Sequence, residues 1–155
     1  MRRLVPFIAA MIIALSGAAA RADFADGAEA YDGGDYATAF TEWIGLARDD
    51  DATAQVAIAG MFRFGEGRRV DPVKAARWYR RAADLGEPIA QLNLGEMYLM
   101  GVGVPQDVVR AHLWLSLAAR QDRAWARDKR DALARSMSRD QLDRADKLLH
   151  DWDAR

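Results

Sequence analysis

The sequence repeats itself with a step of 36 residues. Residues 54–83 align with residues 90–119 without a gap, and many aligned positions are identical. The identical pairs include Ala54 and Ala90, Gln55 and Gln91, Gly65 and Gly101, Gly67 and Gly103, Asp71 and Asp107, and Trp78 and Trp114. The same step backwards places Asp35 before Asp71 and Ala39 before Ala75, which adds a third, partial copy. A repeat of this length is typical of arrays of one supersecondary unit.

Each copy has the pattern of two helices joined by a short turn. Asp71 followed by Pro72 is a strong helix start, because aspartate accepts hydrogen bonds from free backbone N–H groups and proline fits the first helical turn. The apolar residues that follow recur at helical spacing and therefore form one stripe. They are Ala75, Trp78, Tyr79, Ala82 and Ala83. A preceding helix is expected over residues 52–64 and ends at Gly65, which tolerates positive φ.

A lone hairpin cannot bury such a stripe, so the pattern predicts an all-α stack of about four hairpins. They are expected at about residues 24–50, 51–86, 87–121 and 122–152. The last hairpin does not match the repeat and is interpreted as a terminal cap. Its second helix is predicted to open at Ser138, with Gln141 at capping-box spacing. Its inward stripe is predicted to be Leu142, Ala145, Leu148, Leu149 and Trp152.

The first 22 residues have the three-part form of a secretory signal peptide. Arg2 and Arg3 precede an apolar run, and small residues at Ala20 and Ala22 end it. We expect cleavage between Ala22 and Asp23, with cleavage after Ala20 as an alternative. An uncleaved membrane anchor is the other interpretation, because the run approaches the length of a membrane span. Cleavage would leave one domain over residues 23–155, without a membrane span and most naturally in the periplasm.

Composition narrows the classes of function. A formal net charge of −1 argues against binding to nucleic acid. There is no cysteine, which excludes disulfides, cysteine nucleophiles and thiolate metal sites.

The repeated residues resemble the Sel1-like repeat. The motif residues are Ala90, Gln91, Leu94, Gly95, Tyr98, Gly101, Gly103, Val104 and Asp107 in the third hairpin, and Ala75, Trp78, Tyr79, Ala82, Ala83 and Gly86 in the second. The resemblance covers roughly residues 27–121 and implies a right-handed, tetratricopeptide-like α-solenoid with a concave groove. It also implies an adaptor or scaffold role, often in the bacterial envelope or in host contact.

Some positions depart from the family pattern. Ala59 stands where the pattern has glycine, Arg68 where it has valine, Leu115 where it has tyrosine and Asp122 where it has glycine. One cysteine-rich exported branch is described as β-lactamase-like, and this chain lacks its paired cysteines. That activity is therefore not transferred.

Residues that carry chemistry are few and scattered. His112 and His150 have no cluster of metal ligands beside them, and Ser116 lies outside a Gly-x-Ser-x-Gly context. The run from Asp49 to Asp51 could bind calcium, but capping of the next helix by Asp51 is favoured. We predict no catalytic residue, cofactor or metal site, and hence no enzyme.

A partner-binding groove is expected along the first helices of the hairpins. If the inward positions of tetratricopeptide-like first helices are transferred to this sequence, six residues are predicted to line the groove. They are Val56, Gly60, Arg63, Leu92, Glu96 and Leu99. The leading hypothesis is an exported adaptor that binds a peptide or protein there, in envelope signalling or assembly. An envelope hydrolase acting on cell-wall or small-molecule substrates and a self-assembling structural protein are the alternatives. The second hairpin is also basic, because it carries Arg68, Arg69, Arg77, Arg80 and Arg81. An exposed helix face is the favoured interpretation of these arginines, and an acidic partner is the alternative.

Overall fold

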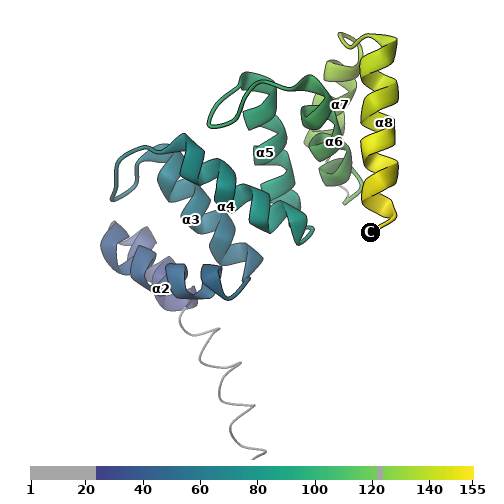
Figure 1. Cartoon of the computed structure of the whole chain (residues 1–155). Coiled ribbons are helices and arrows are strands. Elements are labelled where there is room, and N and C mark those ends of the chain that lie inside the picture. The colour runs from purple at the N-terminus through teal and green to yellow at the C-terminus, as the bar shows by residue number, and fades with distance from the viewer. Residues whose placement is uncertain (1–23, 122–123) are drawn as a thin grey trace, which may run out of the picture.

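The computed structural model describes residues 24–121 and 124–155, and these form a stack of helical hairpins without a strand (Figure 1). A helix over residues 24–32 is followed by α2 (Tyr36–Arg48), α3 (Ala52–Phe64), α4 (Pro72–Asp84), α5 (Pro88–Met100), α6 (Val108–Ala119), α7 (Ala124–Ala134) and α8 (Arg139–Asp153). The predicted all-α solenoid of four hairpins is confirmed. The predicted signal peptide, residues 1–22, and the junction at 122–123 lie outside the described residues.

The helix starts follow the predicted caps. The side chains of Asp35, Asp51, Asp71 and Asp107 each accept a hydrogen bond from a backbone N–H in the first turn of α2, α3, α4 and α6. Ser138 and Gln141 form the predicted capping box at α8. Such caps are each worth about 1 kcal/mol, and each fixes the residue at which its own helix begins.

The Gly-x-Gly turns also connect one hairpin to the previous one. Gly65 and Gly101 end α3 and α5 in the left-handed region, at φ 76° and 69°. The second glycine of each turn packs on the start of the second helix of the preceding hairpin, which is α2 for Gly67 and α4 for Gly103. A Cβ on Gly67 would overlap Tyr36, and a Cβ on Gly103 would overlap the Pro72 carbonyl. The sequence predicted the positive φ at the end of the first helix. The contact of the second glycine with the preceding hairpin could not be predicted, because it depends on how the hairpins pack.

The glutamine that repeats at positions 55 and 91 is buried in both copies and has the same role in each. The Nε2 of Gln55 donates to the Ala47 carbonyl at 2.9 Å, and the Nε2 of Gln91 donates to the Ala83 carbonyl at 3.3 Å. Both carbonyls lie in the last turn of a second helix, and that of Ala83 also accepts from the Gly86 N–H at 3.0 Å. Each glutamine therefore ties its own helix to the helix that precedes its hairpin.

Alanines and aromatic rings fill the core, and α8 closes one end of it. Trp114 is 1% exposed and meets Trp152 of α8 edge to face, with ring centroids 5.2 Å apart. Arg120, at the end of α6, also donates two hydrogen bonds to Asp153, the last residue of α8, at 2.7 and 3.0 Å. One part of the predicted α8 stripe is wrong, because Leu148 is exposed at the edge of the α6–α8 contact.

Within the described part of the chain, no helix combines the length and the apolar character that crossing a membrane requires.

Candidate interaction surface

The first helices of three successive hairpins are linked by charged side chains. The guanidinium of Arg63 on α3 lies 3.6 Å from the carboxylate of Glu96 on α5. The ammonium of Lys129 on α7 lies 2.8 Å from the same carboxylate. Arg63 also donates a hydrogen bond to the side-chain oxygen of Asn93. We call Arg63, Glu96 and Lys129 the ion ladder. It fixes the spacing of three helices and leaves Glu96 neutralised from both sides.

The ion ladder lies beside a buried tyrosine. Burial raises the pKa of the Tyr79 hydroxyl, while the charge of Arg63 and a hydrogen bond to it act in the opposite direction. The hydroxyl thus stays protonated at neutral pH and is available to position the Arg63 guanidinium.

Exposed apolar side chains flank the ion ladder. Residues four or seven apart on a helix share a face, which places neighbours of Glu96 and Lys129 on the same side as the ladder, and the Arg63 guanidinium lies 5.4 Å from the ring centre of the adjacent Phe64. These neighbours are Phe64 on α3, Ile89 and Met100 on α5, and Trp125 on α7. Each has between 40% and 65% of its surface exposed. Together with the ion ladder they form a surface that we call the first-helix face. Apolar residues around a charged centre are a composition found at protein interfaces.

The structure places the six predicted groove residues in different surroundings. Arg63 and Glu96 are brought together as an ion pair. Leu92 is 8% exposed and belongs to the core, whereas Val56 and Leu99 are half-buried against it. Gly60 is half-buried, and a Cβ there would meet nothing closer than the Tyr79 hydroxyl at 3.9 Å. Contact of these six residues with a partner stays a prediction.

The exposed apolar residues of the first-helix face were missed from the sequence. The sequence did contain a pattern that points to them, because Phe64 and Met100 are 36 residues apart, as are Ile89 and Trp125. Large apolar residues at equivalent repeat positions outside the buried stripe indicate a shared exposed face.

His112 and Ser116 form a buried pair on α6. The Oγ of Ser116 lies 3.5 Å from the Nδ1 of His112, one helical turn away, and both residues are less than 10% exposed. Burial lowers the pKa of His112, although Asp146 and Asp131 partly oppose the effect and Arg130 adds to it. Charged groups of α7 and α8 are close enough to act on His112, so the pair lies against those two helices, and we assign it to packing.

The acidic run before α3 has distinct structural roles. Asp51 caps α3, and Asp50 pairs with Arg81 at 2.7 Å and accepts a hydrogen bond from Gln55. Across residues 24–121 and 124–155, no three histidine or acidic side chains are grouped as metal ligands would be.

Comparison with known proteins agrees with this architecture. Residues 52–87 and 88–122 each match the family model of the Sel1 repeat. The chain is similar to a protective antigen present in uropathogenic Escherichia coli strains, which displays an SLR fold. The identity is 28% and the TM-score 0.80, over 86% of this chain and 29% of that one. It is also similar to a Sel1 repeat protein from Oxalobacter formigenes, with 32% identity and a TM-score of 0.68, over 71% of this chain and 45% of that one.

The chain spans less than half the length of either of these two proteins. No curated protein matches the sequence significantly.

Hairpins that repeat their caps, turns and core positions define an all-α solenoid repeat protein. With two matched repeats, the chain belongs to the Sel1 repeat family, as the motif residues predicted. Sel1 repeats are generally protein–protein interaction modules. The matched region begins at residue 52, so the first hairpin, with its shorter connection, lies outside it.

Proposed function

We propose that this protein is an exported adaptor, acting in the periplasm, that holds a segment of a partner protein against its first-helix face. Envelope signalling or assembly is the setting that an exported interaction module would serve. The observation that carries the proposal is the first-helix face itself, where four large apolar side chains are exposed around one ion ladder.

The geometry suits a segment with apolar side chains at both ends and polar groups between them. Ile89 and Met100 mark the two ends of α5, and Glu96 lies between them. Buried apolar anchors supply most of the affinity at protein interfaces, whereas charged groups set orientation. The segment would therefore gain affinity from Ile89, Met100 and Trp125 and its register from the ion ladder.

Two pairs of exposed apolar residues allow a matched test of the face. The face variant is Ile89→Glu with Met100→Glu, and the control is Val70→Glu with Leu85→Glu. All four side chains are at least 40% exposed, so neither variant disrupts the core. Each protein is used to capture partners from a periplasmic fraction, and bound proteins are quantified by mass spectrometry. We expect the wild-type and control proteins to retain the same partner and the face variant to lose it.

Equal capture by the face variant would exclude the first-helix face as the binding surface.

Export has its own test, because cleavage at the predicted site leaves Asp23 as the first residue. Mass spectrometry of the protein from a periplasmic fraction reads this terminus directly. An intact N-terminus, or a cytoplasmic location, would refute export by a cleaved signal.

A further inference from the structure

A hollow of about 470 Å³ lies on the other side of the hairpins, between α4 and the turn that leads into α6. We call it the arginine hollow. The residues of its lining that matter for binding are Arg77, Arg80, Arg81, Leu94 and Tyr98. Its volume is within the range of sites that hold one or two side chains of a ligand. The hollow exists because α4 does not pack closely on α6, so that part of α5 forms its floor.

The floor of the arginine hollow is apolar and its wall is cationic. Leu94 and Tyr98 come from α5, and both are at least 95% buried. Arg77, Arg80 and Arg81 come from α4, at spacings that place all three along one side of that helix. Among the described residues that line it, none is acidic. A ligand for this site therefore needs an apolar group and more than one negative charge.

The three arginines differ in how firmly they are held. Arg80 lies 3.2 Å from Asp84, its Nη1 is 3.5 Å from the Tyr98 hydroxyl, and its guanidinium stands 5.1 Å from the Trp114 ring centre. Arg81 pairs with Asp50. Exposed pairs of this kind contribute little and exchange readily. Within the described part of the chain Arg77 makes no ion pair, so its charge is directly available.

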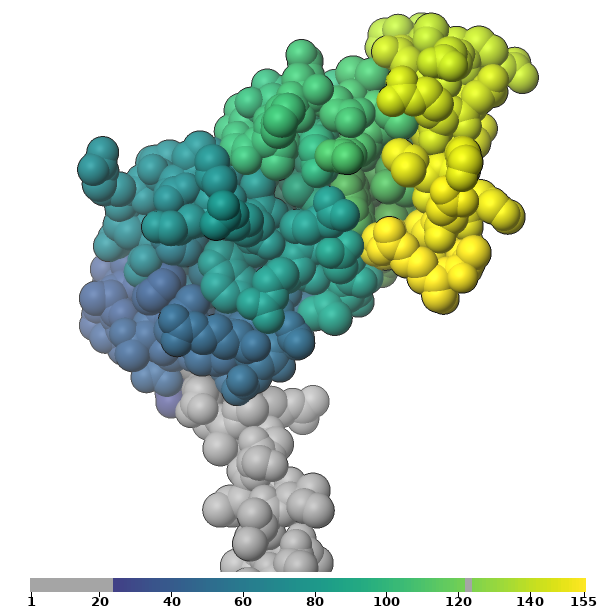
Figure 2. Space-filling model, in the orientation of Figure 1, coloured from purple at the N-terminus to yellow at the C-terminus, as the bar shows by residue number. Residues whose placement is uncertain are grey.

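Further arginine side chains lie beyond the arginine hollow, in the direction of α8. A second hollow of about 310 Å³ shares Arg80 and is lined by apolar residues of α6 and α8 together with Arg110 and Arg155. Figure 2 shows the molecule recessed there, between the teal surface of α4 and the yellow surface of α8. Asp151 is the one acidic residue among those lining this second hollow in the described chain. Because Arg80 lines both hollows, a segment that extends from one to the other can contact this side chain along its way.

We propose that the arginine hollow binds an acidic peptide segment of a partner protein, with one hydrophobic side chain on the Leu94–Tyr98 floor and flanking carboxylates on Arg77, Arg80 and Arg81. Arginine suits this task because its planar guanidinium donates two parallel hydrogen bonds to one carboxylate. The site is separate from the first-helix face and does not depend on it.

Fluorescence anisotropy with three labelled twelve-residue peptides tests the proposal. One peptide places two leucines among glutamates, a second replaces the leucines with serine, and a third replaces the glutamates with lysine. At 50 mM NaCl we expect saturable binding of the first peptide, at least tenfold weaker binding of the second and none of the third. Affinity should fall further at 200 mM NaCl, because screening weakens exposed charge contacts.

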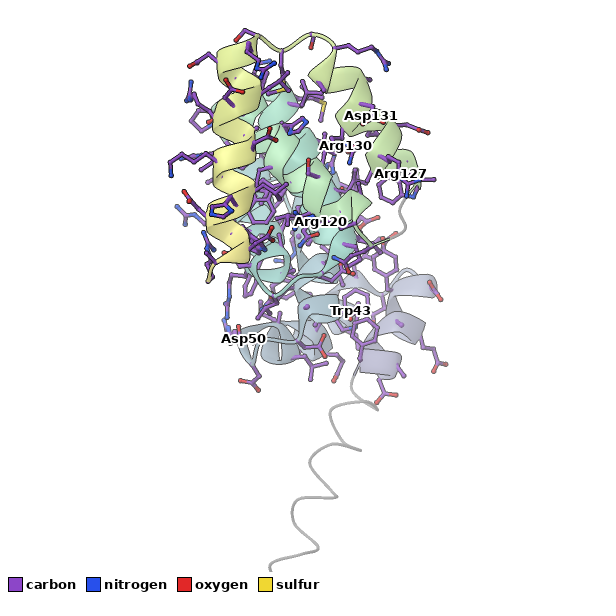
Figure 3. The ribbon with its side chains drawn as sticks, turned by 90° about the vertical axis from the view of Figure 1, so that its right-hand side faces the viewer. Trp43, Asp50, Arg120, Arg127, Arg130 and Asp131 are labelled. Atoms are coloured by element: carbon purple, nitrogen blue, oxygen red, sulfur yellow. The ribbon has the colours of Figure 1, made fainter. Side chains whose placement is uncertain are left out.

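Paired variants separate the site from general charge. Arg77→Ala with Arg81→Ala should weaken binding of the leucine–glutamate peptide at least tenfold. The control, Arg127→Ala with Arg135→Ala, removes the same charge from exposed positions elsewhere and should stay within twofold of wild type. Figure 3 places Arg127 on the side of α7 that is remote from α8. The Ile89→Glu, Met100→Glu variant should also bind normally, which keeps this site distinct from the proposed function.

Several results would overturn the proposal. These are no saturable binding of the leucine–glutamate peptide at 50 mM NaCl, equal binding of the serine peptide, or equal losses in the two arginine variants. Phosphatidylglycerol vesicles serve as an alternative anionic probe. Sedimentation with these vesicles that depends on Arg77, without peptide binding, would identify a membrane surface as the occupant and refute the peptide site.

Discussion

The helices α4 and α6 occupy the same position in successive repeats but have different surroundings. In α4 the buried residues form one stripe, and arginines cover the opposite side. In α6 every residue from Ala111 to Ala119 is buried. Trp78 and Trp114 are equivalent in the repeat, yet Trp78 is only partly buried whereas Trp114 is 1% exposed.

The difference comes from what packs on each helix. Both α7 and α8 cover α6, and Trp152 closes over Trp114. The corresponding side of α4 has no such cover and borders the arginine hollow. The same motif position is therefore core in one repeat and only partly buried in the next. The cap hairpin decides which of the two it becomes.

Removing the two tryptophans tests this comparison most strongly. Trp114→Ala is expected to lower the free energy of unfolding by about 3–5 kcal/mol, because it leaves a cavity beneath α8. Trp78→Ala should cost only about 1–2 kcal/mol, since its ring is already partly in water. Urea denaturation followed by circular dichroism measures both values. Equal losses would show that α8 does not create the difference.

The Gly-x-Gly turns should behave alike in both repeats. Gly67→Ala and Gly103→Ala each combine a positive φ with overlap against the preceding hairpin, so each should cost about 2 kcal/mol or more. Gly34→Ala is the control, because Gly34 has a positive φ of 82° but open space around it. It should cost roughly 1 kcal/mol. The same urea titration compares the three, and a harmless Gly103→Ala would contradict the inter-hairpin contact.

The covered helix α6 should also make stability depend on pH through His112. Burial lowers the pKa of the folded imidazole from its ordinary value of 6.5. The unfolded state takes up a proton first as the pH falls through 6.5, so the folded state loses stability below that pH.

We therefore expect the Tm of the wild-type protein to fall between pH 7.5 and 5.5. The fall should be smaller in His112→Gln. The matched control is His150→Gln, because the His150 side chain is exposed, and it should follow the wild type. A wild-type fall that persists in His112→Gln would assign the effect to other groups.

The smallest effect is expected at the exposed Arg120–Asp153 pair. Asp153→Asn should leave the unfolding midpoint almost unchanged, because exposed ion pairs contribute little. Amide hydrogen exchange in the last turn of α8 should nevertheless become faster. A large loss of global stability in this variant would mean that charge, rather than the Trp114–Trp152 contact, holds α8 over α6.

Much of the fold could be predicted from local patterns. Caps such as Asp71 and Ser138 act within their own first turn, so their effect does not depend on distant parts of the chain. The 36-residue step also located equivalent core positions, because each copy of the repeat carries its apolar residues at the same places. The candidate site was predicted less well. Leu92 was assigned to the groove and is buried, whereas the exposed Ile89 was missed.

The sequence by itself determined where the helices begin and end, which residues repeat, and that the hairpins must stack to bury their stripes. The helix limits follow from interactions within one or two helical turns, and the need to stack follows from an apolar stripe that one hairpin cannot bury. Only the tertiary structure decided that Glu96 bridges α3 and α7, that α8 buries Trp114, and that a hollow remains beside Arg77. Each of these depends on the small rotation between neighbouring helices, which side chains from several hairpins set together.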